Sequence, residues 1–135
     1  MTKKKPVRIQ DVMTTGFLLV DGLDSVRDAM QKMRERGIAV LIVKKRDDDD
    51  EYGIVVPADI AKKVLGQDRS PGRLNVYEIM SKPVISVHSR MDVRYCARLF
   101  ERFGLSVAPV IDDSEVLGVV SYNGIVLQGF VDAEA

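Results

Sequence analysis

One stretch of the chain occurs twice, and this duplication limits the possible folds more than any other feature of the sequence. Residues 53–60, Gly-Ile-Val-Val-Pro-Ala-Asp-Ile, return as residues 118–125, Gly-Val-Val-Ser-Tyr-Asn-Gly-Ile. Both copies begin with a short apolar run, which is typical of a buried strand. Pro57 follows the first run and suits the start of a helix, because proline loses no hydrogen bond at the first helical position. The apolar frame is kept between the copies, whereas the polar positions differ.

The duplication extends over most of the 135 residues. Pairs such as Met13 and Met80, or Gly37 and Gly104, lie 67 positions apart. After a charged turn the spacing falls to 65, and a surface loop tolerates such a difference. A repeat of about 60 residues is only marginally stable alone, because it buries too little of its surface. We therefore expect two repeats that pack through their sheets with pseudo-two-fold symmetry.

Composition sets the expected boundaries of the repeats. We place the first repeat at residues 7–66 and the second at residues 76–131, together forming one module. Residues 67–75 contain the Gly, Pro and Ser typical of a linker. The basic residues 1–6 are expected to form a flexible N-terminal arm.

Each repeat is predicted to contain a strand, a helix, two strands and a second helix, which makes an α/β fold. In the first repeat the helix between the first two strands has Asp24 or Ser25 as its N-cap and ends at Gly37. Its buried face is expected to hold Val26, Ala29, Met30 and Met33. The remaining elements are a helical turn at 9–13, strands at 17–20, 38–43 and 52–56, a charged turn at 44–51 and a helix at 57–65.

The second repeat is expected to follow the same order. Its first strand ends near Val87, which corresponds to Val20. The helix that follows has an apolar stripe at helical spacing. The residues of this stripe are Val93, Cys96, Ala97, Phe100 and Phe103.

The composition excludes several classes of protein. Lys and Arg together number 20, as do Asp and Glu, so the net charge is zero and nothing indicates a nucleic-acid partner. Cys96 is the only cysteine, so no internal disulfide can form. No apolar run follows the N-terminal lysines as in a signal peptide, and no stretch reaches the length of a membrane span. We expect a cytoplasmic protein without membrane association.

The repeat resembles a tandem pair of CBS domains, the regulatory module named after cystathionine beta-synthase. Three pairs of segments carry the resemblance from about residue 7 to residue 130. They are residues 11–14 and 78–81 before each first strand, 37–40 and 104–112 after each first helix, and 53–59 and 118–124 at each last strand. The resemblance implies binding of an adenosine-containing ligand (AMP, ADP, ATP, NAD or S-adenosylmethionine) in clefts between the repeats. It also implies a homodimer and regulation of a partner protein.

The last-strand motif of this family has Ser or Thr and, three positions later, an Asp that binds ribose. In the first repeat Asp59 is present, but Val56 stands in place of the Ser or Thr. In the second repeat Ser121 is present, but Gly124 stands in place of the Asp. An ionised carboxylate suits ribose because it accepts charge-assisted hydrogen bonds from hydroxyl groups. We therefore expect one competent cleft at most.

The resemblance implies which residues would line each cleft. The first cleft would combine Asp59, Val56 and Ala58 with residues of the second repeat, namely Ser81, Val84, Ile85, Val107, Ala108 and Pro109. The second, weaker cleft would combine Ser121 with Leu18, Val40 and Leu41. No cofactor is required, and the nucleotide would act as a regulatory ligand.

Phosphate-binding residues are sparse in the expected cleft. Many relatives have basic residues where this chain has Ala58, Ala39 and Ser106, although Lys62 or Lys63 could substitute. The pattern therefore favours a ligand recognised mainly through adenosine. The alternative interpretation of Asp59 is a carboxylate that stabilises the start of a helix through the helix dipole.

Other candidate sites are weaker. His88 has no nucleophile beside it in the sequence and is expected at the surface, whereas Cys96 is expected in the core. The acidic residues 47–51 lack the ligand spacing of a calcium loop and are interpreted as a solvated turn. No Cys and His spacing indicates zinc, and no phosphate-binding Gly-rich motif indicates nucleotide hydrolysis. The sequence thus predicts a non-enzymatic regulatory module, with a ligand-free structural or dimerisation module as the alternative.

Overall fold

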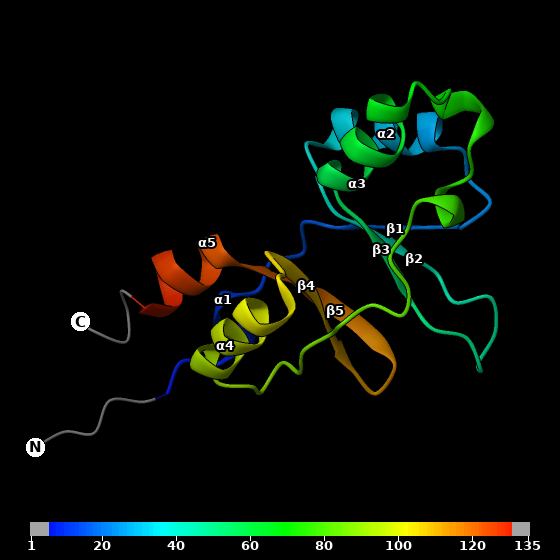
Figure 1. The fold of residues 1–135 in the computed structure, drawn as a ribbon. Coiled ribbons are helices and arrows are strands. Elements are labelled where there is room, and N and C mark those ends of the chain that lie inside the picture. The colour runs from blue at the N-terminus through cyan, green and yellow to red at the C-terminus, as the bar shows by residue number, and fades with distance from the viewer. Residues whose placement is uncertain (1–5, 131–135) are drawn as a thin grey trace, which may run out of the picture. The chain divides into compact units, whose positions relative to one another are not determined.

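The computed structural model describes residues 6–130, which form two compact units (Figure 1). The central unit is Gly16–Val84, and the terminal unit combines Met1–Thr15 with Ile85–Ala135. Each unit has its own hydrophobic core. Except for Pro6, the expected N-terminal arm lies outside the described residues.

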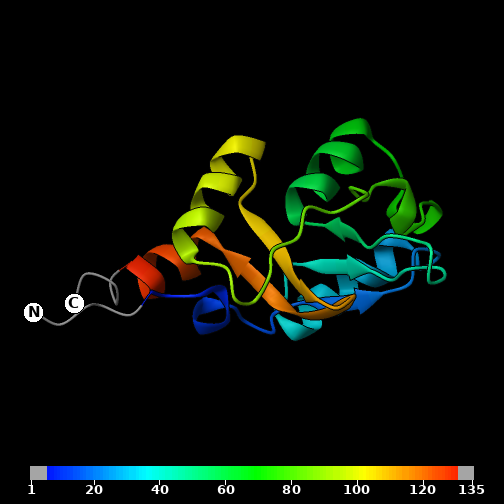
Figure 2. The ribbon, with the colours of Figure 1, turned by 90° about the horizontal axis from the view of Figure 1, so that it is seen from below.

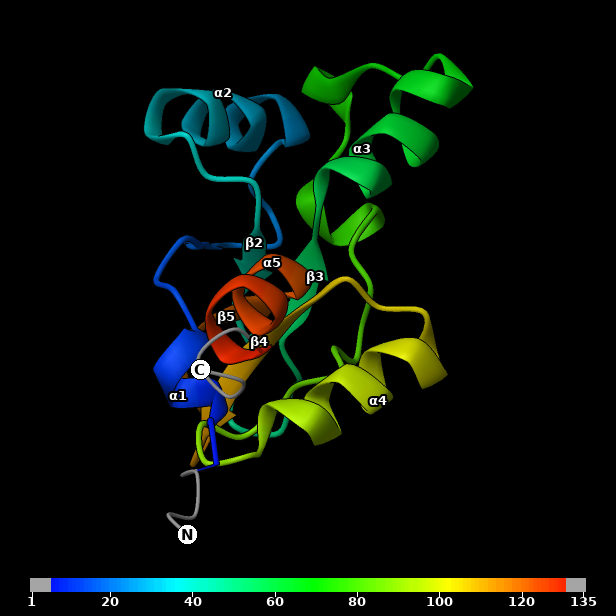
Figure 3. The same cartoon turned by 90° about the vertical axis from the view of Figure 1, so that its left-hand side faces the viewer.

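The central unit is a three-stranded sheet with two helices on one face (Figures 1 and 3). The first and second strands are parallel, and the second and third are antiparallel. The middle strand is buried along its whole length. The elements are β1 (Leu18–Val20), α2 (Val26–Arg36), β2 (Leu41–Val43), β3 (Gly53–Val55), α3 (Pro57–Lys63) and the 3-10 turns η1 (Leu65–Gln67), η2 (Pro71–Arg73) and η3 (Val76–Glu78).

Local sequence signals fix both ends of α2. The Oγ of Ser25 accepts a hydrogen bond from the backbone N–H of Asp28 at 3.1 Å, so Ser25 rather than Asp24 is the N-cap. Gly37 ends the helix with φ of 62°, a left-handed conformation that costs glycine little. Val26 and Ala29 are buried on the face predicted from the sequence.

The terminal unit is a β-hairpin with α1 and α4 on opposite sides (Figures 2 and 3). Phe100 of α4 is fully buried and makes an edge-to-face contact with Tyr122, with ring centroids 5.2 Å apart. The elements are α1 (Ile9–Val12), α4 (Val93–Phe103), β4 (Val107–Asp112), β5 (Glu115–Ser121), α5 (Tyr122–Gly124) and the π-helix η4 (Ile125–Phe130).

Each unit contains a short segment from the other sequence repeat. In the central unit Ser81 pairs with Ile54, and each backbone N–H donates to the other residue's carbonyl at 2.9–3.0 Å. In the terminal unit Thr14 pairs with Val119 in the same way, with both distances at 2.9 Å. These four residues are equivalent in pairs, because Thr14 and Ser81 are 67 positions apart and Ile54 and Val119 are 65 apart. The segment before each repeat's first strand therefore supplies a backbone partner to the last strand of the other repeat.

Three details of the prediction are wrong. The first strand of the second repeat is reduced to one bridge, in which Val87 N–H donates to the Pro109 carbonyl at 3.0 Å. The strand predicted at 38–43 begins only at Leu41. Phe103 was predicted on the buried stripe of its helix, but it is the last residue of α4 and is 53% exposed. The α/β fold with two repeats is confirmed, and their packing through the sheets stays a prediction.

Candidate ligand site at Asp59

The turn from β3 into α3 positions Asp59. Val56 is extended, with φ of −122° and ψ of 164°, and Pro57 is the first helical residue. Pro57 presets the backbone angle φ that the helix requires. Asp59 therefore lies in the first helical turn, directly after a buried strand.

The carboxylate of Asp59 is held by its own helix. Its Oδ2 accepts a hydrogen bond from the backbone N–H of Val56 at 3.0 Å, which satisfies a donor at the helix N-terminus. Its Oδ1 lies 3.5 Å from the Nζ of Lys63, one turn further along α3. The same ammonium donates to the Ile79 carbonyl at 3.0 Å. Asp59 therefore caps the start of its own helix, whichever further role it has.

This structural role leaves acceptor capacity on Asp59. Each carboxylate oxygen has two lone pairs, and the Asp59 side chain is 18% exposed. Lys63 already contacts Asp59 and the Ile79 carbonyl, which leaves one of its three ammonium donors for another group. Lys62 is exposed and Ala58 adds no charge, which leaves few groups to hold a phosphate beside Asp59.

The structure places the other predicted residues of the central unit around the same sheet. Ser81 pairs with β3, and the N–H of Val84 donates to the Tyr52 carbonyl at 3.2 Å. The N–H of Leu18 donates to the carbonyl of Val40 at 3.0 Å, so these two residues of the predicted weaker cleft are neighbours. Leu41 is buried in β2.

The remaining predicted residues belong to the terminal unit. Val107, Ala108 and Pro109 lie on β4 and pair in register with Ser121, Val120 and Val119 of β5. Ala108 is fully buried, and Ile85 is 37% exposed.

Packing explains why the second repeat has no carboxylate at the ribose position. A Cβ atom at Gly124 would lie 2.8 Å from the backbone carbonyl oxygen of Val12. An aspartate there would force α1 away from α5. Ser121, at the N-cap of α5, makes no side-chain capping hydrogen bond.

The two other reactive side chains have ordinary surroundings. Cys96 is fully buried, as predicted, and burial raises the pKa of its thiol to about 11. His88 is 72% exposed, with Nδ1 3.2 Å from Oδ1 of Asp112. Asp112 also accepts hydrogen bonds from the hydroxyl and the N–H of Ser89, which lower the pKa of the carboxyl group.

Among residues 6–130, no group of three or more His, Cys, Asp or Glu could hold a metal ion.

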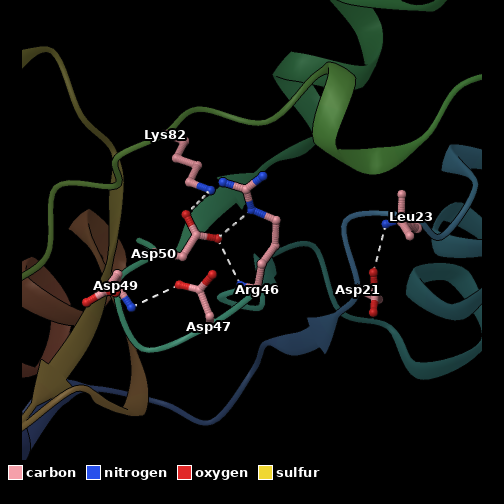
Figure 4. A network of polar contacts seen from close by, with 7 residues as sticks. All are labelled: Asp21, Leu23, Arg46, Asp47, Asp49, Asp50 and Lys82. Carbon is pink, nitrogen blue, oxygen red and sulfur yellow. Dashed lines mark hydrogen bonds and ion pairs between the residues drawn. The ribbon is translucent and has the colours of Figure 1, made fainter.

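The acidic turn contains an ordered ion-pair network that the sequence analysis missed (Figure 4). Asp50 was interpreted as part of a solvated turn, but its side chain is only 7% exposed. Its carboxylate lies 2.5 Å from the Nζ of Lys82 and accepts hydrogen bonds from the N–H and Nε of Arg46 at 2.8 and 3.1 Å. Lys82 first, and then Arg46, hold the pKa of Asp50 far below its ordinary value. No local sequence signal identifies this contact, because Lys82 is 32 positions away (82 − 50).

The comparisons define the class of protein. The family model for the CBS domain matches residues 9–66 and 76–127, so the chain belongs to the CBS-domain family as a tandem pair. Within the part of the chain that the structure describes, no helix is long and apolar enough to cross a membrane.

One curated protein and one solved structure are similar to most of this chain. Protein MK0525 from Methanopyrus kandleri is 35% identical over 123 residues, which cover 90% of this chain and 62% of that protein. The chain therefore spans less than two thirds of that relative. The structure of a hexameric CBS-CP12 protein from bloom-forming cyanobacteria is 36% identical, with a TM-score of 0.90, and covers 95% of this chain and 75% of that one.

A third similar structure contains ligands. The CBS domain pair of protein MJ0100, in complex with 5-methylthioadenosine and S-adenosyl-L-methionine, is 25% identical with a TM-score of 0.75. The match covers 90% of this chain and 98% of that one, so it extends over nearly the whole of both.

Proposed function

We propose that this CBS pair is a regulatory module that binds one adenosine-containing ligand, with the carboxylate of Asp59 accepting hydrogen bonds from the ribose hydroxyls. The observation that carries the proposal is the position of Asp59, in the first turn of α3 directly after β3, with a partly exposed side chain. The bound ligand would alter the interaction with a partner protein through its different affinity for two arrangements of the repeats. No catalytic step is part of this proposal.

The surroundings of Asp59 support a ligand recognised mainly through its nucleoside. Ala58 follows the helix start where a basic residue would hold phosphate, and Lys63 already contacts Asp59. The MJ0100 complex supports this ligand class, because 5-methylthioadenosine has no phosphate. We therefore expect 5-methylthioadenosine and S-adenosylmethionine to bind more tightly than ATP.

The test must separate the ligand role of Asp59 from its capping role. Asn retains an oxygen that can accept from the Val56 N–H, so Asp59→Asn is expected to keep the fold. It removes the charge, and the loss of about 1.5–3 kcal/mol for a charge-assisted hydrogen bond corresponds to about 10–150-fold in Kd. Isothermal titration with AMP, ADP, ATP, NAD, S-adenosylmethionine and 5-methylthioadenosine measures this change.

Asp28→Asn is the matched control, because Asp28 is also in the first turn of a helix and is exposed. Its affinity for the ligand should equal that of the unmodified chain. Unchanged affinity in Asp59→Asn would remove Asp59 from the site. Failure of every adenosine compound to bind would refute the proposal as a whole.

The alternative, a ligand-free dimerisation module, is favoured by apolar residues exposed on the terminal unit. Tyr95 and Phe103 of α4 are 61% and 53% exposed, and Val126 and Leu127 of η4 are 49% and 65% exposed. This alternative predicts no stabilisation by adenosine compounds and a dimer in sedimentation that Tyr95→Glu disrupts. The hexamer of the CBS-CP12 protein supports self-association of this chain. Self-association alone does not favour this alternative, because a dimer can also bind a ligand.

A further inference from the structure

A second candidate site lies in the central unit, at the carboxyl ends of the parallel strands β1 and β2. An open cavity of about 570 Å³ is present there, which is within the usual size range of small-molecule sites. Ligands of α/β sheets commonly bind beyond the carboxyl ends of parallel strands. The cavity is lined by Asp21, Gly22, Leu23, Val43, Lys44, Lys45, Arg46, Tyr77, Met80 and Lys82.

This cavity is separate from the site at Asp59. β3 is antiparallel to β2, with Gly53 paired to Val43 and Val55 paired to Leu41. The carboxyl end of β3 therefore lies beside the amino end of β2. Asp59 follows that end of β3, so it lies at the opposite end of the strands from the cavity. Ligands in the two places would touch different residues of the central unit.

The lining of the cavity is strongly basic. It includes four cationic side chains, those of Lys44, Lys45, Arg46 and Lys82, against one carboxylate, that of Asp21. Oδ1 of Asp21 accepts from the N–H of Leu23 at 2.9 Å (Figure 4). Asp50 lies outside the lining and pairs with Lys82 and Arg46, but the four cations still outnumber the two carboxylates of Asp21 and Asp50, which favours an anionic ligand.

Asp50 holds two of these cations in place. Its buried carboxylate contacts the Nζ of Lys82 and the Nε of Arg46, so both side chains are oriented before a ligand arrives. The Arg46 side chain remains 82% exposed, and its Nε is the atom that contacts Asp50. A guanidinium oriented in this way can donate two parallel hydrogen bonds to a phosphate.

The cavity also has an apolar side. Leu23 is 74% exposed and Tyr77 is 49% exposed, although both are large hydrophobic residues. The N–H of Tyr77 donates to the Gly22 carbonyl at 3.0 Å, and a Cβ at Gly22 would approach the Cβ of Tyr77 to 3.2 Å. Tyr77 is therefore fixed against the loop that follows β1, with an exposed surface on which an organic group can pack.

The same place in the terminal unit is built differently. The backbone contact between Tyr77 and Gly22 has an equivalent in the terminal unit, where the N–H of Gln10 donates to the Ser89 carbonyl at 2.8 Å. Gly22 and Ser89 are 67 positions apart, and so are Gln10 and Tyr77. There the position of Lys45 is taken by Asp112, which hydrogen-bonds to Ser89. The same backbone contact thus lies beside a Ser–Asp hydrogen bond in the terminal unit and beside a cationic cavity in the central unit.

We propose that this cavity binds a small phosphorylated organic molecule. Lys44, Arg46 and Lys82 would hold the phosphate, and Leu23 and Tyr77 would contact the organic group. This binding is independent of the adenosine ligand proposed at Asp59.

Phenyl phosphate is a suitable probe, because it joins one phosphate to one flat apolar ring. Titration of the full, isotopically labelled chain should shift the amide signals of Gly22, Leu23, Lys44, Arg46 and Tyr77 in NMR spectra, with a Kd of about 1 mM. Lys44→Gln should weaken binding about tenfold, the loss of one charge-assisted hydrogen bond. Lys32→Gln, on the exposed part of α2, is the matched control and should not change the Kd.

Two further comparisons make the test specific. Orthophosphate should bind at least about fivefold more weakly than phenyl phosphate, and Tyr77→Ser should remove that difference. Asp59→Asn should leave the phenyl phosphate affinity unchanged, which separates this site from the adenosine site. The proposal would be overturned by signal shifts confined to residues near Asp59, by no shifts at about 10 mM, or by equal losses in Lys44→Gln and Lys32→Gln.

Discussion

The two repeats differ most instructively at equivalent positions of their last helices, Asp59 and Gly124. Asp59 accepts the Val56 N–H, contacts Lys63 and keeps some exposure. At Gly124 the backbone of α1 approaches so closely that a Cβ would lie 2.8 Å from the Val12 carbonyl oxygen. The duplicated frame therefore has room for a carboxylate in one repeat only. A repeat can thus keep its fold while packing excludes a side chain that the other repeat carries at the equivalent position.

The equivalent helices α2 and α4 provide the largest expected contrast in stability. Phe100 of α4 and Met33 of α2 are equivalent, but Phe100 is fully buried whereas Met33 is half-buried. Phe100→Ala should lower the free energy of unfolding by about 3–5 kcal/mol, and Met33→Ala by about 1–2 kcal/mol. Chemical denaturation measures both. Equal losses would contradict the view that the terminal unit depends more on a single side chain.

The two strand glycines give a smaller contrast. A Cβ at Gly118 would lie 2.6 Å from the backbone oxygen of Thr14, whereas a Cβ at Gly53 would meet the Sδ of Met80 at 2.6 Å. A methionine side chain can move, but a paired backbone cannot move without breaking the contact between Thr14 and Val119. Gly118→Ala should cost about 2–3 kcal/mol and Gly53→Ala about 1 kcal/mol or less. Thermal unfolding of the two variants tests this order, and a larger loss for Gly53→Ala would reverse it.

The smallest expected effect concerns pH. Hydrogen bonds from Ser89 and the neighbouring His88 hold the pKa of Asp112 below its ordinary value of 3.8. The resulting stability is present above about pH 4 and is lost as the pH falls through the lowered pKa. Ser89→Ala should raise the pKa of Asp112 and reduce the loss of stability in acid.

NMR titration of the Asp112 carboxyl group measures this change. His88→Asn is the accompanying variant and should raise the pKa less than Ser89→Ala, because His88 is largely exposed. In the central unit Gly22 and Lys45 occupy the equivalent positions, so that unit lacks this pair. An unchanged Asp112 pKa in Ser89→Ala would show that the hydrogen bonds from Ser89 are not its cause.

Local signals predicted much of the fold. Periodicity located α2 and α4, Ser25 and Gly37 defined the ends of α2, and Pro57 marked the start of α3. The helix-start carboxylate Asp59 was predictable for the same reason, since capping depends on residues within one turn.

Features that depend on distant residues could not be predicted. The approach of α1 to Gly124 joins positions 112 residues apart (124 − 12), and no pattern in either segment records it. The burial of Asp50 depends on Lys82, while the surrounding acidic residues indicate only a solvated turn. The first strand of the second repeat is reduced to one bridge at Val87, which apolar spacing alone does not show.

The pairing of Thr14 with Val119, and of Ser81 with Ile54, has a consequence for dissecting the chain. A fragment cut between the repeats would leave each sheet with an unprotected edge, since the piece that completes it would belong to the other fragment. When the two fragments are mixed, each can supply the segment that completes the other's sheet. The smallest unit of this architecture that satisfies all its strand edges is therefore the pair of repeats.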